Sequence, residues 1–327
     1  MKIENSQIAV SSRIRLARNF DGINFPSIIR NTDEERRILA FTVDLFIKIG
    51  GYEVIPINGL SKIEVESLTE RYLISGNLSS SRYGAVILNA DKSVSVMVNE
   101  EDHVREQCIL SGLDLKGAYR KLSAVDALLS RTFRFAKSGS AFLTSCPSNV
   151  GSGMRASVMV FLPALTNTSR INEIIEMALS RGLTVRGAFG EGSDTEGYLY
   201  QISNRTTLDG VSAIIERVER FVTEVERIET DQRYDIFNAD RNEFEDKCMR
   251  SLGILKSCRL LSYPECAELI SSVKLGFYLG FIYLRNPTAL DDLMVTVRPS
   301  TLKLVTGDDN DLIARADYVK NALKLIE

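Results

Sequence analysis

The sequence predicts an α+β fold followed by a smaller helical domain, on the basis of two observations. Short runs of apolar and β-branched residues, bounded by polar turns, alternate with helical patterns up to about residue 210. Beyond residue 211 the apolar residues recur at helical spacing, and no comparable strand pattern follows. We therefore expect a first domain over residues 1–230 and a helical domain over residues 231–327.

The N-terminal half contains two predicted helices and a hairpin. Residues 33–49 carry apolar side chains at helical spacing, with Thr32 as a cap and two glycines after the last turn. Two β-rich runs, 85–88 and 94–98, are separated by a polar turn, which predicts an antiparallel hairpin. Apolar spacing predicts a further helix over residues 113–135.

The later elements of the first domain place polar loops at strand ends. We predict a strand over residues 142–145 that leads into a loop beginning at Cys146. Strands over 183–189 and 198–203 flank a polar stretch rich in glycine. An amphipathic helix over 211–228 follows them.

The composition is that of a soluble globular protein. The chain has 327 residues, enough for two domains. Of these residues, 44% are hydrophobic and 25% are charged. A net charge of -3 gives no positive excess to hold a nucleic-acid backbone, so we expect no direct nucleic-acid partner. The N-terminal residues lack a signal-peptide pattern, and no apolar run reaches membrane-spanning length. We expect a cytoplasmic protein without a membrane partner.

Cysteine and histidine content limits the metal chemistry. The five cysteines form no CxxC pair, and their odd number argues against a complete disulfide framework. With His103 as the single histidine, a zinc site is not expected. A metal, if used, should be a hard cation such as Mg2+ that arrives with a nucleotide.

The first candidate site is the segment Ser11-Ser12-Arg13-Ile14-Arg15. Alternation in an extended chain places its two arginines on one side. Guanidinium groups stay charged and donate hydrogen bonds in a fixed fork that suits phosphate oxygens. The segment could therefore grip an oligophosphate, although the polar face of an ordinary strand has the same pattern.

The second candidate site follows the predicted hairpin. Glu100, Glu101 and Asp102 stand together, and Arg105 lies four residues past Glu101. The structural alternative is a solvated helix start with a Glu101–Arg105 pair worth about 0.3 kcal/mol.

The third candidate site is the loop CPSNVGSGMRAS, residues 146–157. Its small residues would let the backbone and Arg155 approach a ligand closely. It lacks the lysine of a P-loop and the spacing of a GxGxxG turn. A lone Cys146 is more often an inert buried thiol, but nearby arginines would favour its thiolate.

The fourth candidate site is RGAFGE, residues 186–191, where a predicted strand turns through glycines and exposes a carboxylate. A plain turn is the alternative.

Taken together, the four patterns resemble the phosphagen (guanidino) kinase family in order, residue type and spacing. SSRIR resembles its nucleotide-binding S-x-R-x-R, NEEDHVR its acidic box, CPSNVGSGMRAS its cysteine loop, and RGAFGE its second arginine–glutamate loop. The bacterial protein-arginine kinase branch is also similar in GMRASVMVFLPAL and GEGS...QISN.

This resemblance is strong over residues 8–210 and weaker beyond them. It implies a guanidino-kinase catalytic domain, with a mainly antiparallel sheet flanked by helices, and the use of ATP and Mg2+. Phosphoryl transfer depends chiefly on positioning and charge stabilisation, which an arginine-rich site supplies. The implied ATP-binding residues are Ser11, Ser12, Arg13, Ile14, Arg15, Arg105, Arg155, Ala156, Ser157, Val158, Met159, Arg186, Gly187, Ala188, Phe189 and Gly190.

The resemblance also implies the catalytic groups. Glu101 and Glu191 would clamp the acceptor guanidinium, and one of them would take its proton. The Cys146 thiolate would add a third negative contact, and Glu100 would hold a magnesium-bound water. Asp194 or Glu196 could replace Glu191 in a different alignment. We favour Glu191 because its R-x4-E spacing from Arg186 equals that of the family motif.

Protein arginine is the expected acceptor. Small-molecule kinases of the family carry a helical domain before S-x-R-x-R that helps to cover the substrate, whereas here SSRIR begins at residue 11. We expect an ATP-dependent protein-arginine kinase. A small-guanidine phosphagen kinase and a catalytically silent adaptor that binds arginine or phosphoarginine remain the alternatives.

The similar branch implies partners that the residues themselves do not reveal. These are a zinc-finger activator, a Clp-type protease and a heat-shock repressor in a stress response. A homodimer is a further candidate assembly. Its C-terminal domain also carries an R-D-x-x-R-A motif that senses phosphoarginine. Arg315 matches the end of that motif, but Asp311 and Leu312 stand where its first Arg and Asp would be.

Overall fold

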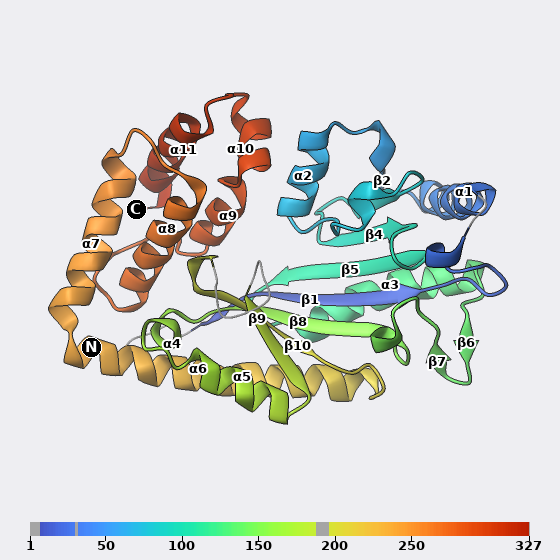
Figure 1. Ribbon diagram of the computed structural model, residues 1–327, viewed down its shortest axis with the longest axis horizontal. Coiled ribbons are helices and arrows are strands. Elements are labelled where there is room, and N and C mark those ends of the chain that lie inside the picture. Colours follow the sequence, from blue (N-terminus) through green and yellow to red (C-terminus); the bar gives the residue numbers. More distant parts are fainter. Residues whose placement is uncertain (1–6, 30–31, 188–195, 327) are drawn as a thin grey trace.

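A computed structural model describes residues 7–29, 32–187 and 196–326, and its centre is an eight-stranded sheet (Figure 1). The strand order is β2-β3-β4-β5-β1-β8-β10-β9, and every neighbouring pair is antiparallel. The strands are β1 (Ala9–Arg18), β2 (Tyr52–Pro56), β3 (Ala85–Asn89), β4 (Val94–Val98), β5 (Val104–Ser111), β8 (Met154–Phe161), β9 (Leu183–Gly187) and β10 (Leu199–Asn204). A separate two-stranded ribbon contains β6 (Lys137–Ser138) and β7 (Ala141–Phe142).

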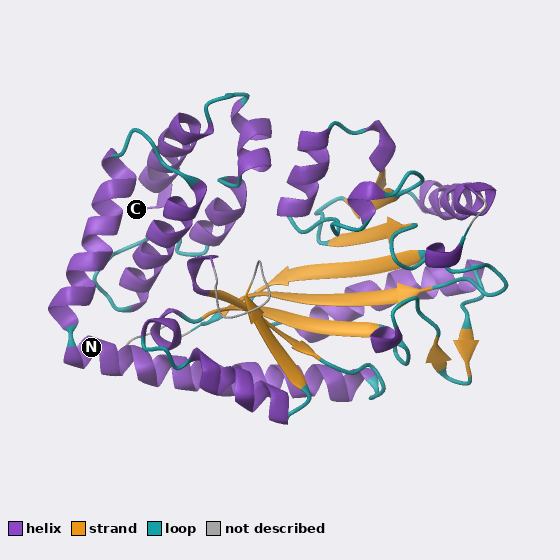
Figure 2. Ribbon diagram, in the orientation of Figure 1, coloured by secondary structure: helices purple, strands orange, loops and turns teal. Residues whose placement is uncertain are grey.

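Helices cover one face of this sheet and enclose the main core (Figure 2). Alternation along β1 turns Ile14 and Leu16 into that core, where they are fully buried, and leaves the arginines between them on the other face. The covering helices are α1 (Thr32–Ile49), α3 (Leu115–Thr132), α5 (Ile171–Ser180) and α6 (Val211–Ala239), with the short α4 (Pro163–Asn167) beside them. Short 3-10 turns are η1 (Pro26–Ile28), η2 (Ile57–Gly59), η4 (Pro147–Asn149) and η5 (Glu196–Tyr198).

In the described part of the first domain, a helix and a 3-10 turn cover the opposite face at its β2–β4 edge. There α2 (Lys62–Glu70) and η3 (Leu78–Ser80) enclose a second, smaller core that includes Leu78, Val86 and Met97. Helix α2 begins with a capping box, in which Ser61 and Glu64 satisfy each other's backbone N–H groups. The middle of this face is left for polar groups.

The C-terminal helices form a domain with its own core, in which Val273 and Leu290 are fully buried. They are α7 (Arg241–Ser257), α8 (Tyr263–Tyr278), α9 (Ala289–Thr296), α10 (Pro299–Thr306) and α11 (Asp311–Ile326). They stand at one end of the sheet, and α10 lies beside α2 (Figure 1). The predicted boundary near residue 230 falls within α6. No helix in the described part of the chain is long and apolar enough to span a membrane.

Most predicted elements are confirmed, including the α+β class with a mainly antiparallel sheet flanked by helices. The hairpin over 85–98 and the helices near 33–49, 113–135 and 211–228 are present. The strand predicted over 142–145 is wrong beyond its first residue, because Ser145 N–H donates to Asp102 Oδ1 and not to a neighbouring strand.

Candidate active site

Two arginines of β1 project from the face of the sheet that lies opposite the main core. Arg15 lies directly opposite Arg155 on β8 and opposite Gln107 on β5. Arg13, two residues earlier, lies opposite Ser157. Because side chains directly opposite each other share a face, these groups form one polar row across three strands.

Two cavities open on this face, and both contain predicted site residues. The small cavity has a volume of about 160 Å3. The large cavity has a volume of about 890 Å3 and is bounded by the sheet on one side and by the C-terminal domain on the other. The small cavity is lined by Arg15, Ala17, Glu101, Arg105, Cys146, Ser148, Asn149, Gly153 and Arg155. From the predicted set, Ser11, Arg13, Ser157 and Met159 line the large cavity.

Positive charge is concentrated beside these cavities. Burial first, and then Arg105 and Arg155, lower the pKa of Arg13 to about 10. Burial, together with Arg13 and Arg105, lowers the pKa of Arg15 well below its usual range. Since guanidinium groups remain protonated at neutral pH, the cluster repels itself, and an anion would relieve that repulsion. Within the described residues, the buried Nε groups of Arg13 and Arg155 have no hydrogen-bond partner.

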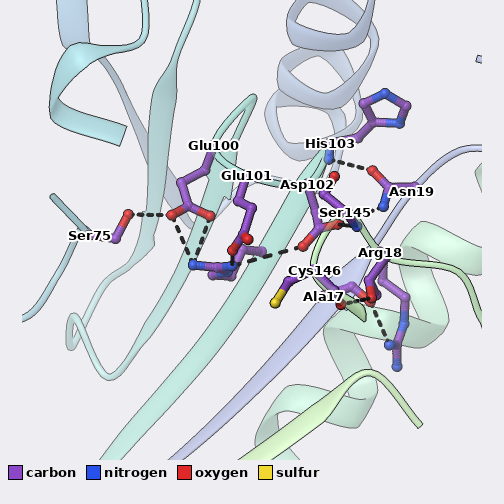
Figure 3. Close-up of polar contacts among 12 residues, drawn as sticks. Ala17, Arg18, Asn19, Ser75, Glu100, Glu101, Asp102, His103, Ser145 and Cys146 are labelled. Atoms are coloured by element: carbon purple, nitrogen blue, oxygen red, sulfur yellow. Dashed lines mark hydrogen bonds and ion pairs between the residues drawn. The ribbon is translucent and has the colours of Figure 1, made fainter. Parts of the chain in front are cut away.

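Arg105 joins the acidic box to this cluster. Its Nη1 lies 2.8 Å from both carboxylate oxygens of Glu100, and its Nη2 lies 2.5 Å from Glu101 Oε2. The Glu100 side chain is fully buried and also accepts from Ser75 Oγ at 2.6 Å (Figure 3), whereas that of Glu101 is 33% exposed. Of these two carboxylates, it is Glu101 that lines the small cavity. The box is a turn between β4 and β5, so the alternative of a solvated helix start is wrong.

Asp102 fixes the cysteine loop to this turn. Its buried Oδ1 accepts from Asn19 Nδ2 and from Ser145 N–H, both at 2.7 Å (Figure 3). Asn19 Oδ1 in turn accepts from the backbone N–H of His103. These contacts were not predicted, because each joins residues far apart in the sequence. They place Cys146, the residue after Ser145, at the small cavity.

Glycines allow the cysteine loop to turn back toward β1. Gly153 has a φ of +64°, and a Cβ there would lie 2.8 Å from Ala17 O. Gly151 has a φ of +128°, and a Cβ there would lie 2.5 Å from Thr207 O. Only glycine tolerates both conditions. Cys146 is half-buried, and its Sγ lies 3.0 Å from Ser148 Oγ.

Other predicted ATP-binding residues lie elsewhere. The side chains of Ser12, Ile14, Ala156 and Val158 are buried on the helix-covered side of the sheet, so at most their backbones could approach a ligand. Arg186 lies opposite Gln201 and is exposed. The pKa of Arg155 is lowered mainly by burial and next by the charge of Arg186. Gly187 is the last residue of β9. Ala188, Phe189, Gly190, Glu191 and Asp194 lie outside the described residues.

The described residues contain no cluster of three or more His, Cys, Asp or Glu side chains that could hold a metal ion. Glu100, the predicted magnesium contact, has its carboxylate occupied by Arg105 and Ser75. Oxygen donors suit a hard cation, but a single carboxylate does not form a cage. A magnesium ion would therefore depend mainly on ligands that a nucleotide brings.

Arg315, the candidate phosphoarginine sensor, is fully buried. Its Nε donates to Val297 O at 2.8 Å and its Nη1 to Leu261 O at 3.0 Å, while Nη2 pairs with Asp311 at 3.1 Å. The guanidinium therefore ties three parts of the C-terminal domain together, and its donors face protein acceptors.

Comparisons with known proteins identify the family of the chain. The family model for the "ATP:guanido phosphotransferase, C-terminal catalytic domain" matches residues 36–232, and that for the "Protein-arginine kinase McsB C-terminal domain" matches residues 241–327. Curated proteins named protein-arginine kinase are similar over most of their length. Those of Bacillus licheniformis and Bacillus subtilis are each 38% identical, over 98% of this chain and 91% of their own. That of Bacillus mycoides is 40% identical over 93% of this chain and 87% of its own.

Solved structures share the fold. A duplicated taurocyamine kinase from Schistosoma mansoni, with bound transition-state analogue components, matches with a TM-score of 0.57 and 26% identity. That match covers 67% of this chain and 33% of the kinase. A lombricine kinase matches with a TM-score of 0.61 and 21% identity, over 69% of this chain and 67% of its own.

Proposed function

The chain belongs to the ATP:guanido phosphotransferase family, and on this premise we propose that it is an ATP-dependent protein-arginine kinase. One observation carries the proposal. Glu101, Cys146 and three arginines from three different strands line the same small cavity. Positive groups for a transferring phosphoryl and negative groups for a guanidinium are thus within reach of one reacting centre.

The nucleotide occupies both cavities in this proposal. Arg13 faces the large cavity and Arg15 the small one, so a triphosphate lying along β1 meets both. Its γ-phosphoryl group reaches Arg15, Arg105 and Arg155, where mutual repulsion of the arginines favours an anion. Two of the buried guanidinium groups keep an Nε–H without a partner in the described structure, ready to donate to phosphate oxygens.

The acceptor guanidinium is activated by carboxylate. Glu101 is held by Arg105 at the edge of the small cavity, where it can accept from a guanidinium donor. A guanidino nitrogen forms a bond to the γ-phosphorus as the bond to the bridging oxygen of ADP breaks. The proton released by that nitrogen passes to a carboxylate, either Glu101 or its predicted counterpart Glu191. Cys146, on the same cavity, is the third group that contacts the acceptor.

Magnesium supplies charge neutralisation between the phosphates when it is bound with the nucleotide. The predicted contact of Glu100 with the ion, through water, does not fit a carboxylate that is fully buried against Arg105 and Ser75, so the nucleotide would supply most of the ligands. Glu100 orients Arg105 through the 2.8 Å contact, so its carboxylate has a positioning role whether or not the ion is present.

Protein arginine is the proposed acceptor because the similar curated proteins bear that name and match nearly the whole chain. The second matching family model adds the helical domain of a protein-arginine kinase. A cytoplasmic setting, a zinc-finger activator, a Clp-type protease, a heat-shock repressor and a homodimer belong to the same proposal. Stimulation of transfer by a purified zinc-finger activator would test the first of these partners.

Transfer from γ-labelled ATP tests the proposal against its alternatives. We expect acid-labile label on an arginine-rich protein and little on free arginine. Label on free arginine or taurocyamine alone would indicate a small-guanidine kinase. No label on either, with retained binding of phosphoarginine, would indicate an adaptor.

A further inference from the structure

We propose that Arg298, in the C-terminal domain, is a positioning residue for the nucleotide site and acts through Tyr72. The inference rests on the proposed function, since it assigns the large cavity to the nucleotide. Tyr72 and Arg298 both line that cavity, together with Arg13 of β1. They lie 226 residues apart in the chain, and each belongs to a different domain.

Tyr72 is held in a backbone conformation that favours glycine. Its φ is +59°, which a bulky side chain adopts only when its surroundings require it. Its N–H donates to Thr69 O, and its carbonyl accepts from Gln107 Nε2 at 2.5 Å. Gln107 lies directly opposite Arg15. The backbone of Tyr72 is thus fixed to the strand beside the predicted phosphate-binding arginines.

Arg298 fixes the other end of the same residue. Its Nη2 donates to the Tyr72 hydroxyl at 2.8 Å, and its guanidinium carbon lies 4.8 Å from the centre of the ring. Its Nη1 donates to the backbone carbonyl of Glu70 at 2.5 Å. Arg298 is only 6% exposed, so these contacts are shielded from water and gain strength. The ring therefore cannot rotate away without breaking a contact to the C-terminal domain.

Arg298 is itself held in place by hydrogen bonds between α2 and α10, two helices that are neighbours (Figure 1). Glu70, the last residue of α2, accepts from Ser300 N–H at 3.0 Å and from Thr301 N–H and Oγ1, both at 2.7 Å. These donors are in the first turn of α10, where backbone N–H groups lack partners within the helix. The carboxylate of one domain thus caps a helix of the other, directly after Arg298.

The segment after Tyr72 reaches the catalytic groups. Three residues on, Ser75 donates to Glu100 at 2.6 Å, and Glu100 pairs with Arg105. One short segment therefore connects Arg298 to both cavities. Because Tyr72 lines the large cavity, which is the nucleotide site in this proposal, loss of the Arg298 contact should be measurable as weaker ATP binding.

A double-mutant cycle on the full chain tests the inference. Tyr72→Phe keeps the ring but removes its hydroxyl, and Arg298→Gln removes the guanidinium. We expect each to raise the KM and Kd for ATP about tenfold, with kcat and the KM for the protein acceptor within about twofold of the parent. If the two residues act through one contact, the Kd of the double variant for ATP should not exceed the higher Kd of the two single variants. Arg285→Gln, an exposed arginine in the same domain, is the matched control and should leave ATP binding unchanged.

Additive losses in the double variant, or an unchanged ATP KM in Tyr72→Phe, would overturn the inference. If Arg298→Gln does not fold, Tyr72→Phe decides alone, because a half-buried ring with only its hydroxyl removed retains its packing. Failure of the proposed function has a different signature. In that case the parent chain transfers no phosphoryl group. Calorimetry would still measure the ATP affinity of the parent and of each variant.

Discussion

Arg15 and Arg155 occupy directly opposed positions on β1 and β8, so two cationic side chains share one antiparallel register. Like charges placed this way weaken a sheet. Burial and neighbouring arginines lower the pKa of both groups, which indicates that their charge is costly to the folded state. A bound anion would offset this cost, so binding explains the pair of arginines better than stability does.

Replacing one of these arginines should therefore separate stability from activity. We expect Arg15→Gln to fold with an unchanged or slightly higher Tm, because a repulsive contact is removed. Its kcat/KM for phosphoryl transfer should fall about 10³-fold, the scale of an arginine that stabilises transferring phosphate. Thermal melts and steady-state kinetics check this. Arg120→Gln on α3, an exposed site, serves as control. A lower Tm with an intact rate would contradict our explanation.

Asp102 should matter for structure more than for chemistry. Asp102→Ala removes the acceptor of Ser145 N–H and one of the two acceptors of Asn19 Nδ2, a loss of about 2 kcal/mol in the free energy of unfolding. The Tm should fall by roughly 5 °C. Asp102→Asn retains an acceptor oxygen and should lose less, which makes it the matched control. Equal Tm values for parent and alanine variant would show that the anchor is dispensable.

Glu106 predicts a pH dependence of stability. It faces the covered side of β5, where burial and then Asp126 raise the pKa of its carboxyl well above the usual range, partly offset by Arg18. A raised pKa means that the folded state holds the proton more tightly. This stabilisation is full below about pH 4.5 and is lost as pH rises through the folded-state pKa.

Glu106→Gln mimics the protonated side chain and should avoid that loss. We expect its Tm to exceed that of the parent at pH 8 and the difference to shrink toward pH 4.5. Thermal melts across this range provide the measurement. A difference that is constant with pH would show that packing, and not protonation, is responsible.

Variants of Glu191 and Asp194 distinguish the two candidates for the second carboxylate. From the R-x4-E spacing we predict that Glu191→Gln lowers kcat by about 10² to 10⁴-fold, as expected for loss of a general base. Asp194→Asn should change kcat by much less. The reverse ranking of these two rates would assign the role to Asp194.

The sequence predicted much of the fold because its signals are local. The hairpin over 85–98 follows from two β-rich runs and a turn, and the covering helices follow from apolar spacing. Three of the four motifs also predicted that Arg15, Arg105, Arg155, Glu101 and Cys146 would meet, and all five line one cavity, whereas Arg13 lines the other. The family predicted from those motifs is confirmed.

Contacts across long separations could not be predicted in the same way. Asp102 lies 83 residues from Asn19, and the link between Arg298 and Tyr72 spans 226. No periodicity encodes such pairs, since each depends on how whole elements pack. The same limit explains the wrong strand at 142–145, where a distant carboxylate captures a backbone N–H.

Mapping of phosphorylated residues by mass spectrometry under conditions that preserve acid-labile phosphate tests the central claim most directly. The parent chain, incubated with ATP, Mg2+ and an arginine-rich protein, should place phosphate on arginine side chains. Glu101→Gln should reduce that yield at least about 100-fold while keeping the Tm of the parent. Phosphate on serine, threonine or tyrosine alone, or an undiminished yield from Glu101→Gln, would contradict a guanidinium transfer centred on this cavity.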